Sequence, residues 1–170
     1  NIAFPLVELT SMSGEEREDR IDAVLATVGL TDSARKMPGD LSGGQRKRAA
    51  LARAIVLEPQ LVLYDEPTTG LDPIRSDLIG ELILRLKTRL GITGIVVTHD
   101  LALAFKVADR MIMLYDGRVL AQGTTAEIRA TGDARVTRFL RGEASPEELA
   151  TIESAGASDD RRRNHRAVGG

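Results

Sequence analysis

Apolar residues near the start of the chain recur at the spacing of a helix. Ser13 and Glu16 stand three residues apart, as in a capping box, where each side chain bonds the backbone N–H of the other residue. The apolar positions that follow recur every three or four residues and define one helical face: Ile21, Val24, Leu25 and Val28. Because Gly29 stands where a C-cap glycine belongs, we predict an amphipathic helix between Ser13 and Gly29.

A second helix is predicted after a polar loop over residues 31–40. Ser42 followed by two glycines is typical of a helix start, and apolar residues recur among charged ones from there to about Leu57. Pro59 then ends the pattern, because proline cannot continue a helix.

After Pro59 the apolar residues no longer recur at helical spacing and instead form short continuous runs, as in buried strands. Residues 61–64 form a short apolar run that ends at two acids, and residues 92–98 form a similar run. Between them a long helix is predicted from Pro73 to the residue before Gly91. Its core face is expected at Ile74, Leu78, Leu82, Leu86 and Leu90. A strand, a helix and a strand joined by short links predict a βαβ unit with parallel strands.

The remaining chain predicts smaller elements and a tail. A short helix is expected at 101–108, and Asp116-Gly117 predicts a hairpin between strands near 111–114 and 119–122. A further capping-box spacing at 124–127 and apolar residues at 136–140 predict small helices. From residue 143 the apolar periodicity fades, and the arginine-rich end is expected to be a solvated tail, with a lipid-headgroup or partner contact as the alternative.

Composition narrows the class of protein. The 170 residues are 42% hydrophobic and 28% charged, as in ordinary globular proteins. A formal net charge of −2 gives no overall attraction to nucleic acid, and no nucleic-acid partner is expected. The absence of cysteine excludes disulfides and thiolate metal sites. No apolar run approaches the roughly 20 residues of a membrane span, so a membrane role would need a partner.

Reactive side chains follow the two predicted parallel strands. Asp65 and Glu66 end the first strand and His99 follows the second. In parallel α/β sheets ligands bind beyond the carboxyl ends of the strands. Asp65 is placed to hold Mg²⁺ opposite nucleotide phosphates, and Glu66 to accept a proton from an attacking water. Taken singly, each residue has a simpler alternative: such acids often cap the next helix, and a lone histidine is more often structural.

The glycine-opened helix is a second candidate site. Two glycines let a phosphate approach the free N–H groups of the first turn, and the Ser42 hydroxyl can donate to the same anion. The alternative is an ordinary N-cap followed by a flexible glycine pair. The helix also carries cations, which we interpret as a solvated face: Arg46, Lys47, Arg48 and Arg53.

Four motifs in order resemble those of the ABC-transporter nucleotide-binding domain. They are Leu41-Ser42-Gly43-Gly44-Gln45, Leu61-Val62-Leu63-Tyr64-Asp65-Glu66-Pro67, Thr68-Thr69-Gly70-Leu71-Asp72 and Val97-Thr98-His99-Asp100. The resemblance covers residues 1 to about 142. It implies an α/β fold, a P-loop NTPase of ABC type, with part of a RecA-like parallel sheet, an α-helical signature subdomain and the N-terminal phosphate-loop portion missing.

The resemblance also implies roles for single residues. Glu66 is expected to be the catalytic base and His99 the switch histidine, with Asp65 as the Mg²⁺-linked acid. Residues expected to contact ATP are Leu41, Ser42, Gly43, Gly44 and Gln45 of the signature and Asp72 of the D-loop. Asp72 also fits an N-cap before Pro73.

The implied organisation is that of a dimeric transporter subunit. Residues 1–56 would form the helical subdomain, 57–142 the catalytic part and 143–170 a flexible tail. Two such domains would form a homodimer, peripheral to the cytoplasmic face of the inner membrane and bound to a transmembrane permease. No Gly-x-x-x-x-Gly-Lys-Ser/Thr occurs in these residues, and the chain begins at Asn1. We therefore expect a fragment that is inactive alone, with the phosphate loop and the glutamine loop upstream.

Three stretches are similar to the Mla/Mce-associated phospholipid-transport ATPases. They are residues 1–6, residues 46–54 and residues 133–142. This similarity implies phospholipid transport and an Mce-type lipid-binding partner. Gln45 is less typical of that group, which leaves an amino-acid or other importer as an alternative. A soluble ABC ATPase of translation or repair is the other alternative, but neither the Asn-His substitution typical of translation-type relatives nor the coiled-coil insertion of repair types is present.

Overall fold

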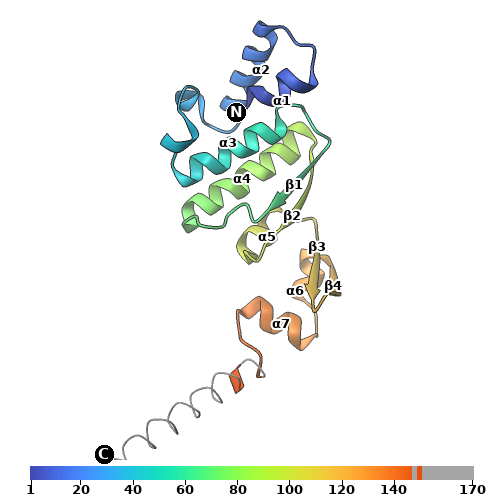
Figure 1. Cartoon of the computed structure of the whole chain (residues 1–170). Helices are drawn as coiled ribbons and strands as arrows, with labels where there is room; N and C mark the ends of the chain where they lie inside the picture. The colour runs from blue at the N-terminus through green and yellow to red at the C-terminus, as the bar shows by residue number, and fades with distance from the viewer. Residues whose placement is uncertain (147–148, 151–170) are drawn as a thin grey trace, which may run out of the picture. The chain divides into compact units, whose positions relative to one another are not determined.

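The computed structural model of the chain describes residues 1–146 and 149–150 (Figure 1). The chain divides into two compact units, Asn1–Val107 and Ala108–Gly170. The first unit holds α1 (Ala3–Leu9), α2 (Gly14–Thr27), η1 (Thr31–Ser33), η2 (Pro38–Asp40), α3 (Gly43–Ile55), β1 (Leu61–Asp65), α4 (Pro73–Leu90), β2 (Thr93–Val97) and α5 (Leu101–Val107). The second holds β3 (Arg110–Tyr115), β4 (Arg118–Thr124), α6 (Thr125–Arg129) and α7 (Ala134–Arg141).

The predicted helix ends are confirmed where a capping box or a C-cap glycine marks them in the sequence. Ser13 and Glu16 form the capping box of α2, with the Glu16 N–H donating to Ser13 Oγ at 3.2 Å. Gly29, after α2, has φ +65°, a conformation that glycine adopts without strain. Helix α1 was not predicted, because it is only seven residues long and no side chain caps its start. Its Leu6 is fully buried in the core of the first unit.

The βαβ prediction is confirmed, with β1 and β2 paired in parallel from Leu61↔Thr93 to Asp65↔Val97. The prediction of fully buried strands is wrong. Only alternate residues of β1 are buried, namely Val62 and Tyr64, and no residue of β2 is fully buried. The helices therefore cover one face of this sheet, while the other face, with Leu61, Leu63, Ile95 and Val97, is exposed.

The predicted core face of α4 is partly wrong. Leu82 and Leu86 are buried as expected, but Ile74, Leu78 and Leu90 are exposed. Successive residues of an α-helix turn by about 100°, so positions four apart drift by about 40° at each step and leave the buried stripe at both ends. The observed stripe is Ile79, Gly80, Leu82, Ile83 and Leu86. Helix α4 packs on α5 and β2, and α2 packs on α3.

The second unit is a hairpin followed by two short helices. Strands β3 and β4 are antiparallel, and both turn residues have positive φ, +48° at Asp116 and +69° at Gly117, as the Asp-Gly signal predicts. Helix α6 begins with the predicted capping box and packs on β4, beside which it lies in Figure 1. The arginine-rich part of the expected tail lies outside the described residues. The functional division at residues 56 and 142 stays a prediction.

Candidate functional site

Glu66 and His99 meet at the carboxyl ends of the two parallel strands. The Glu66 N–H donates to the Val97 carbonyl at 2.9 Å, which extends the ladder by one bond beyond β1. Glu66 then takes a left-handed backbone conformation, with φ +45°. Its Oε1 accepts from His99 Nδ1 at 2.8 Å and from the His99 backbone N–H at 3.1 Å. Two residues that are 33 positions apart are thus brought together by strand pairing.

Further donors fix the second oxygen of the Glu66 carboxylate. Thr69 Oγ1 donates to Oε2 at 3.2 Å and Thr98 Oγ1 at 3.4 Å. The hydrogen bond from the His99 side chain is the main cause that lowers the pKa of Glu66 below its ordinary value; Thr69 lowers it further, while partial desolvation opposes the shift. Glu66 is therefore ionised at neutral pH, as a proton acceptor must be.

Asp65 occupies the last position of β1 and is exposed. It pairs in register with Val97, so its side chain lies on the open face of the sheet. The described residues contain no group of three or more His, Cys, Asp or Glu side chains that could hold a metal ion. The exposed carboxylate of Asp65 is a hard oxygen ligand of the kind that Mg²⁺ binds, and its role in holding Mg²⁺ stays a prediction.

A half-buried hydrogen bond behind the site was not anticipated from the sequence. Thr68 is only 5% exposed, and its hydroxyl donates to Asp100 Oδ2 at 2.9 Å. The other oxygen of Asp100 accepts from the Leu103 N–H at 3.1 Å, at the start of α5. This fixes the loop that carries His99. The three-residue spacing from Asp100 to Leu103 is an N-cap signal that could have indicated part of it.

The signature residues form the start of α3. Ser42 is the N-cap, with the Gln45 N–H donating to Ser42 Oγ at 3.3 Å and the Ser42 N–H donating to Gln45 Oε1 at 2.9 Å. Ser42 and Gly43 are exposed, whereas the Leu41 side chain is buried. Because the Ser42 hydroxyl accepts in the capping box, its hydrogen is free to donate to a ligand. The N-cap and the phosphate-binding interpretations are thus compatible.

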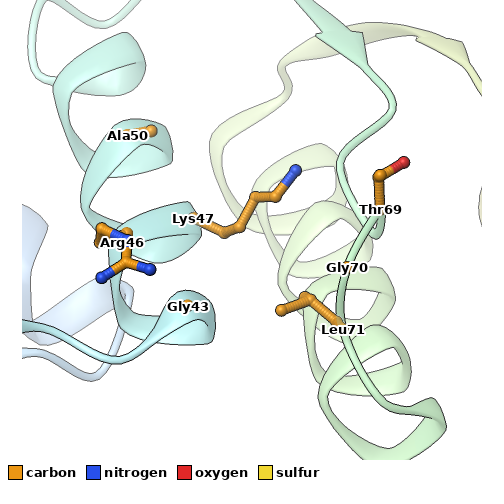
Figure 2. Close-up of a pocket in the computed structure, with 7 residues that line it drawn as sticks. All are labelled: Gly43, Arg46, Lys47, Ala50, Thr69, Gly70 and Leu71. Carbon is orange, nitrogen blue, oxygen red and sulfur yellow. The ribbon is translucent and has the colours of Figure 1, made fainter.

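A pocket of about 330 Å³ lies between α3 and the segment 69–71 (Figure 2). It is lined by Gly43, Arg46, Lys47, Ala50, Thr69, Gly70 and Leu71. A methyl group added at Gly43 would come no closer than 3.9 Å to Leu71. The first turn of α3 is therefore open on this side.

The interpretation of the α3 cations as one solvated face is confirmed for Arg46 and Arg53, which are exposed, and is wrong for Lys47 and Arg48, which are half-buried. Arg46 Nη1 donates to the Leu41 carbonyl at 2.6 Å, and Lys47 Nζ donates to the Glu66 carbonyl at 3.0 Å. Arg48 Nη1 donates to the carbonyls of Val28 and Gly29 at the end of α2, at 2.9 and 2.8 Å. The carbonyls of Val28 and Gly29 lie at the end of α2, where helix carbonyls lack intrahelical partners, whereas the Glu66 carbonyl also accepts a longer bond from the Thr69 N–H. Sequence periodicity cannot indicate the contacts of Lys47 and Arg48, whose backbone partners lie 19 and 20 residues away.

Asp72 is the N-cap of α4. Its Oδ1 accepts from the Arg75 N–H at 3.0 Å, and its Oδ2 lies 2.9 Å from Arg75 Nη1. The backbone N–H of Arg75 is the first cause that lowers the pKa of Asp72, and the Arg75 charge lowers it further. The predicted capping role is therefore observed. A contact with nucleotide stays a prediction, as do the ligand-binding and catalytic roles of the other site residues.

Comparison with known proteins points to one family. Residues 3–69 match the protein family described as "ABC transporter". The chain is 43% identical over 143 residues to the "Intermembrane phospholipid transport system ATP-binding protein MlaF" of Haemophilus influenzae, covering 84% of this chain and 54% of that protein. It is 41% identical over 142 residues to the "Probable ribonucleotide transport ATP-binding protein mkl" of Mycobacterium bovis, covering 84% of this chain and 40% of that protein.

The fold is also found among solved structures. The chain is similar to cbiO1 from Clostridium perfringens, described as part of the ABC transporter complex cbiONQ, with a TM-score of 0.72 and 30% identity over 91% of this chain and 59% of that one. The chain spans about half the length of the curated relatives it matches. These similarities confirm the predicted ABC-type α/β fold.

Proposed function

Because this chain belongs to the family of ABC transporter ATP-binding proteins, we propose that it is part of a subunit that binds and hydrolyses ATP to power phospholipid transport of the Mla/Mce type. The observation that carries the hydrolytic part is the ionised Glu66 carboxylate, held beside His99 at the strand ends. The similarity to a relative named for probable ribonucleotide transport favours another importer as the second candidate.

In the proposed reaction Glu66 orients a water molecule and accepts its proton as the water oxygen bonds to the γ-phosphorus of ATP, while the bond from that phosphorus to the bridging oxygen breaks and ADP leaves. The exposed Asp65 carboxylate would hold Mg²⁺, directly or through water. Bound Mg²⁺ neutralises charge on the phosphate oxygens. We expect His99 to turn its ring from Glu66 towards the terminal phosphate; its side chain is 76% exposed, which leaves the ring room to rotate. Each role uses a group that already lies at this edge of the sheet.

The proposed assembly is a homodimer in which the signature of one subunit closes on ATP held by the other. The open first turn of α3 and the Ser42 hydroxyl are suited to the γ-phosphate. Closure would depend on ATP, and hydrolysis would release it. Within the described residues no helix combines the length and apolar character needed to span a bilayer. We propose a transmembrane permease and an Mce-type lipid-binding protein as partners, with the subunit on the cytoplasmic face.

The base assignment is tested by Glu66→Gln in the protein expressed from its own gene together with its permease. We expect ATP turnover to fall by roughly 10²–10⁴-fold, the usual contribution of a general base. The dimer should accumulate with ATP bound, because closure needs phosphate contacts while hydrolysis needs the base. ATPase assays and gel filtration with ATP measure both effects. Glu15→Gln, at an exposed acid of α2, is the control. Wild-type turnover in Glu66→Gln would remove the assigned role.

The signature assignment is tested separately by Ser42→Arg. A long cation in place of the N-cap hydroxyl puts bulk at the open turn of α3, so we expect ATP-dependent dimerisation to be lost. Analytical ultracentrifugation with ATP measures it, preferably in the Glu66→Gln background. Ser11→Arg adds the same side chain at an exposed loop position. Normal dimerisation of Ser42→Arg would mean that this helix start is not at the interface.

The substrate is tested in the purified transporter. Stimulation of ATP turnover by phospholipid vesicles, with no response to amino acids or ribonucleotides, is the result expected for the Mla/Mce type. Stimulation by a ribonucleotide instead would favour the second candidate.

A further inference from the structure

Lys47 connects the signature helix to the catalytic end of β1. Its side chain extends from α3 towards the segment that carries Thr69 (Figure 2). Its Nζ donates to the backbone carbonyl of Glu66 at 3.0 Å, in a half-buried position 19 residues away in sequence. The contact lies beside the pocket between α3 and residues 69–71.

Because of the backbone conformation of Glu66, the hydrogen bonds of its carbonyl affect the direction of its side chain. With φ at +45°, Glu66 leaves the strand in a region that non-glycine residues rarely adopt. Apart from the bond with Lys47, its carbonyl accepts only a long bond from the Thr69 N–H, at 3.3 Å, among the hydrogen bonds of the described residues. A charged donor forms the shorter and stronger bond. Lys47 therefore orients the peptide that sets the direction of the Glu66 side chain.

Lys47 also lies one helical turn from Gly43 on the same helix. A rigid shift of the 13-residue helix α3 at its first turn would move Lys47 as well, because rigid secondary elements can transmit a displacement along their length. In the proposed dimer this first turn faces ATP held by the partner, whereas Glu66 acts on ATP held by its own subunit. Lys47 thus offers a physical link between the first turn of α3, which faces the ATP held by the partner, and Glu66, which acts on the ATP of its own subunit.

We propose that Lys47 is a positioning residue for Glu66, and that it couples engagement of the signature helix to alignment of the base. This inference rests on the proposed function. Lys47 does not touch ATP in this scheme, and it acts only through the Glu66 backbone. A merely structural lysine would instead affect folding or nucleotide binding in every background.

The test compares variants in the full transporter. Lys47→Met keeps the length of the side chain and removes the donor, and we expect kcat to fall roughly 10-fold, the effect of losing one charge-assisted hydrogen bond. KM for ATP should stay within about twofold, because substrate binding is not altered. Lys47→Arg keeps a donor and should recover most of the rate. Arg53→Met, on the exposed face of the same helix, controls for the loss of charge.

A double-mutant cycle separates positioning from structure. In the Glu66→Gln background Lys47→Met should reduce the residual single-turnover rate by less than about twofold, because the base it positions is already gone. A full additional 10-fold loss, or equal rates for Lys47→Met and Arg53→Met, would overturn the inference. If Lys47→Met does not fold, Lys47→Ala is assayed in the same way. Wild-type turnover in Glu66→Gln itself would overturn the proposed function instead.

Discussion

The low pKa of Glu66 belongs to the state in which His99 is turned towards it. A carboxylate held by several donors is a weak base, because each hydrogen bond favours its ionised form. If His99 turns to a bound phosphate, Glu66 loses its main donor and gains an anion nearby, and both changes raise its pKa towards the range of a useful proton acceptor. The same residue pair can thus keep the base weak before ATP is in place.

Asp133 offers a residue-scale prediction outside the site. It caps α7, accepts from the backbone N–H groups of Arg135 and Val136, and pairs with the Arg135 guanidinium at 3.0 Å. These donors, the Arg135 side chain first, lower the pKa of Asp133 to about 2. We expect Arg135→Gln to raise the pKa of Asp133 towards its ordinary value of 3.8. Carboxyl ¹³C NMR titration measures the shift.

The sign of the effect on stability follows from that lowered pKa. Since the folded state favours the ionised form, the contribution of Asp133 is present above about pH 4 and is lost as the pH falls towards 2. Arg138→Gln removes the same charge from α7 without removing a partner of Asp133, so it is the matched control. An Asp133 pKa that stays near 2 in Arg135→Gln would show that the backbone donors alone cause the shift.

At the scale of elements, the sequence predicted what local chemistry determines. The capping boxes of α2 and α6 need only residues three apart, so their spacing is visible in the sequence, whereas for α3 only the Ser42 N-cap was predicted and the box that Ser42 forms with Gln45 was missed. Whether a strand residue is buried depends on which other elements pack against it, and the sequence does not show where those elements lie. An apolar run such as 92–98 looks the same whether one or both of its faces are covered, which is why the strands were wrongly expected to be buried.

The C-cap of α4 gives an element-scale prediction. Gly91 has φ +65°, and a methyl group added there would meet no atom within 4 Å. Gly91→Ala therefore tests backbone conformation without a clash. We expect it to lower the free energy of unfolding by about 1 kcal/mol, or the Tm by roughly 2–4 °C. Calorimetry or chemical denaturation measures the change.

Gly39 supplies the comparison for Gly91. It also has open space around its Cα, but its φ is not positive. Gly39→Ala should be neutral or slightly stabilising, because alanine reduces the entropy of the unfolded chain. Equal losses in the two variants would mean that the left-handed conformation is not the cause.

At the scale of the whole molecule, the site assembles from segments that parallel strand pairing can bring together. Glu66 and His99 could be predicted as neighbours because both follow strands of one βαβ unit. The Lys47 contact and the Thr68–Asp100 bond could not, since each depends on the packing of a helix or loop against a strand end. Sequence motifs indicate which side chains take part in the chemistry. The packing of helices and loops determines which other residues hold those side chains in position.

The open face of the β1–β2 sheet leads to the last prediction. Leu61, Leu63, Ile95 and Val97 are 48%, 71%, 52% and 59% exposed on this one face. A contiguous apolar surface of this kind is expected to be covered in the working protein and to cause association when it is not. We expect purified residues 1–170 to bind the dye ANS and to self-associate, as measured by fluorescence and light scattering.

Substitutions on the two faces of the paired strands distinguish association caused by the open apolar face from association caused by misfolding. The double substitution Leu63→Thr and Ile95→Thr should reduce dye binding and association. The free energy of unfolding should change by no more than about 0.5 kcal/mol, because both side chains are exposed to water and are not packed in the core. Val62→Thr, one position along on the covered face, should lower the free energy of unfolding by roughly 1–3 kcal/mol and leave the open face apolar. Strong destabilisation by the Leu63 and Ile95 substitutions would mean instead that these side chains are already packed, and that the sheet is covered on both faces within the chain itself.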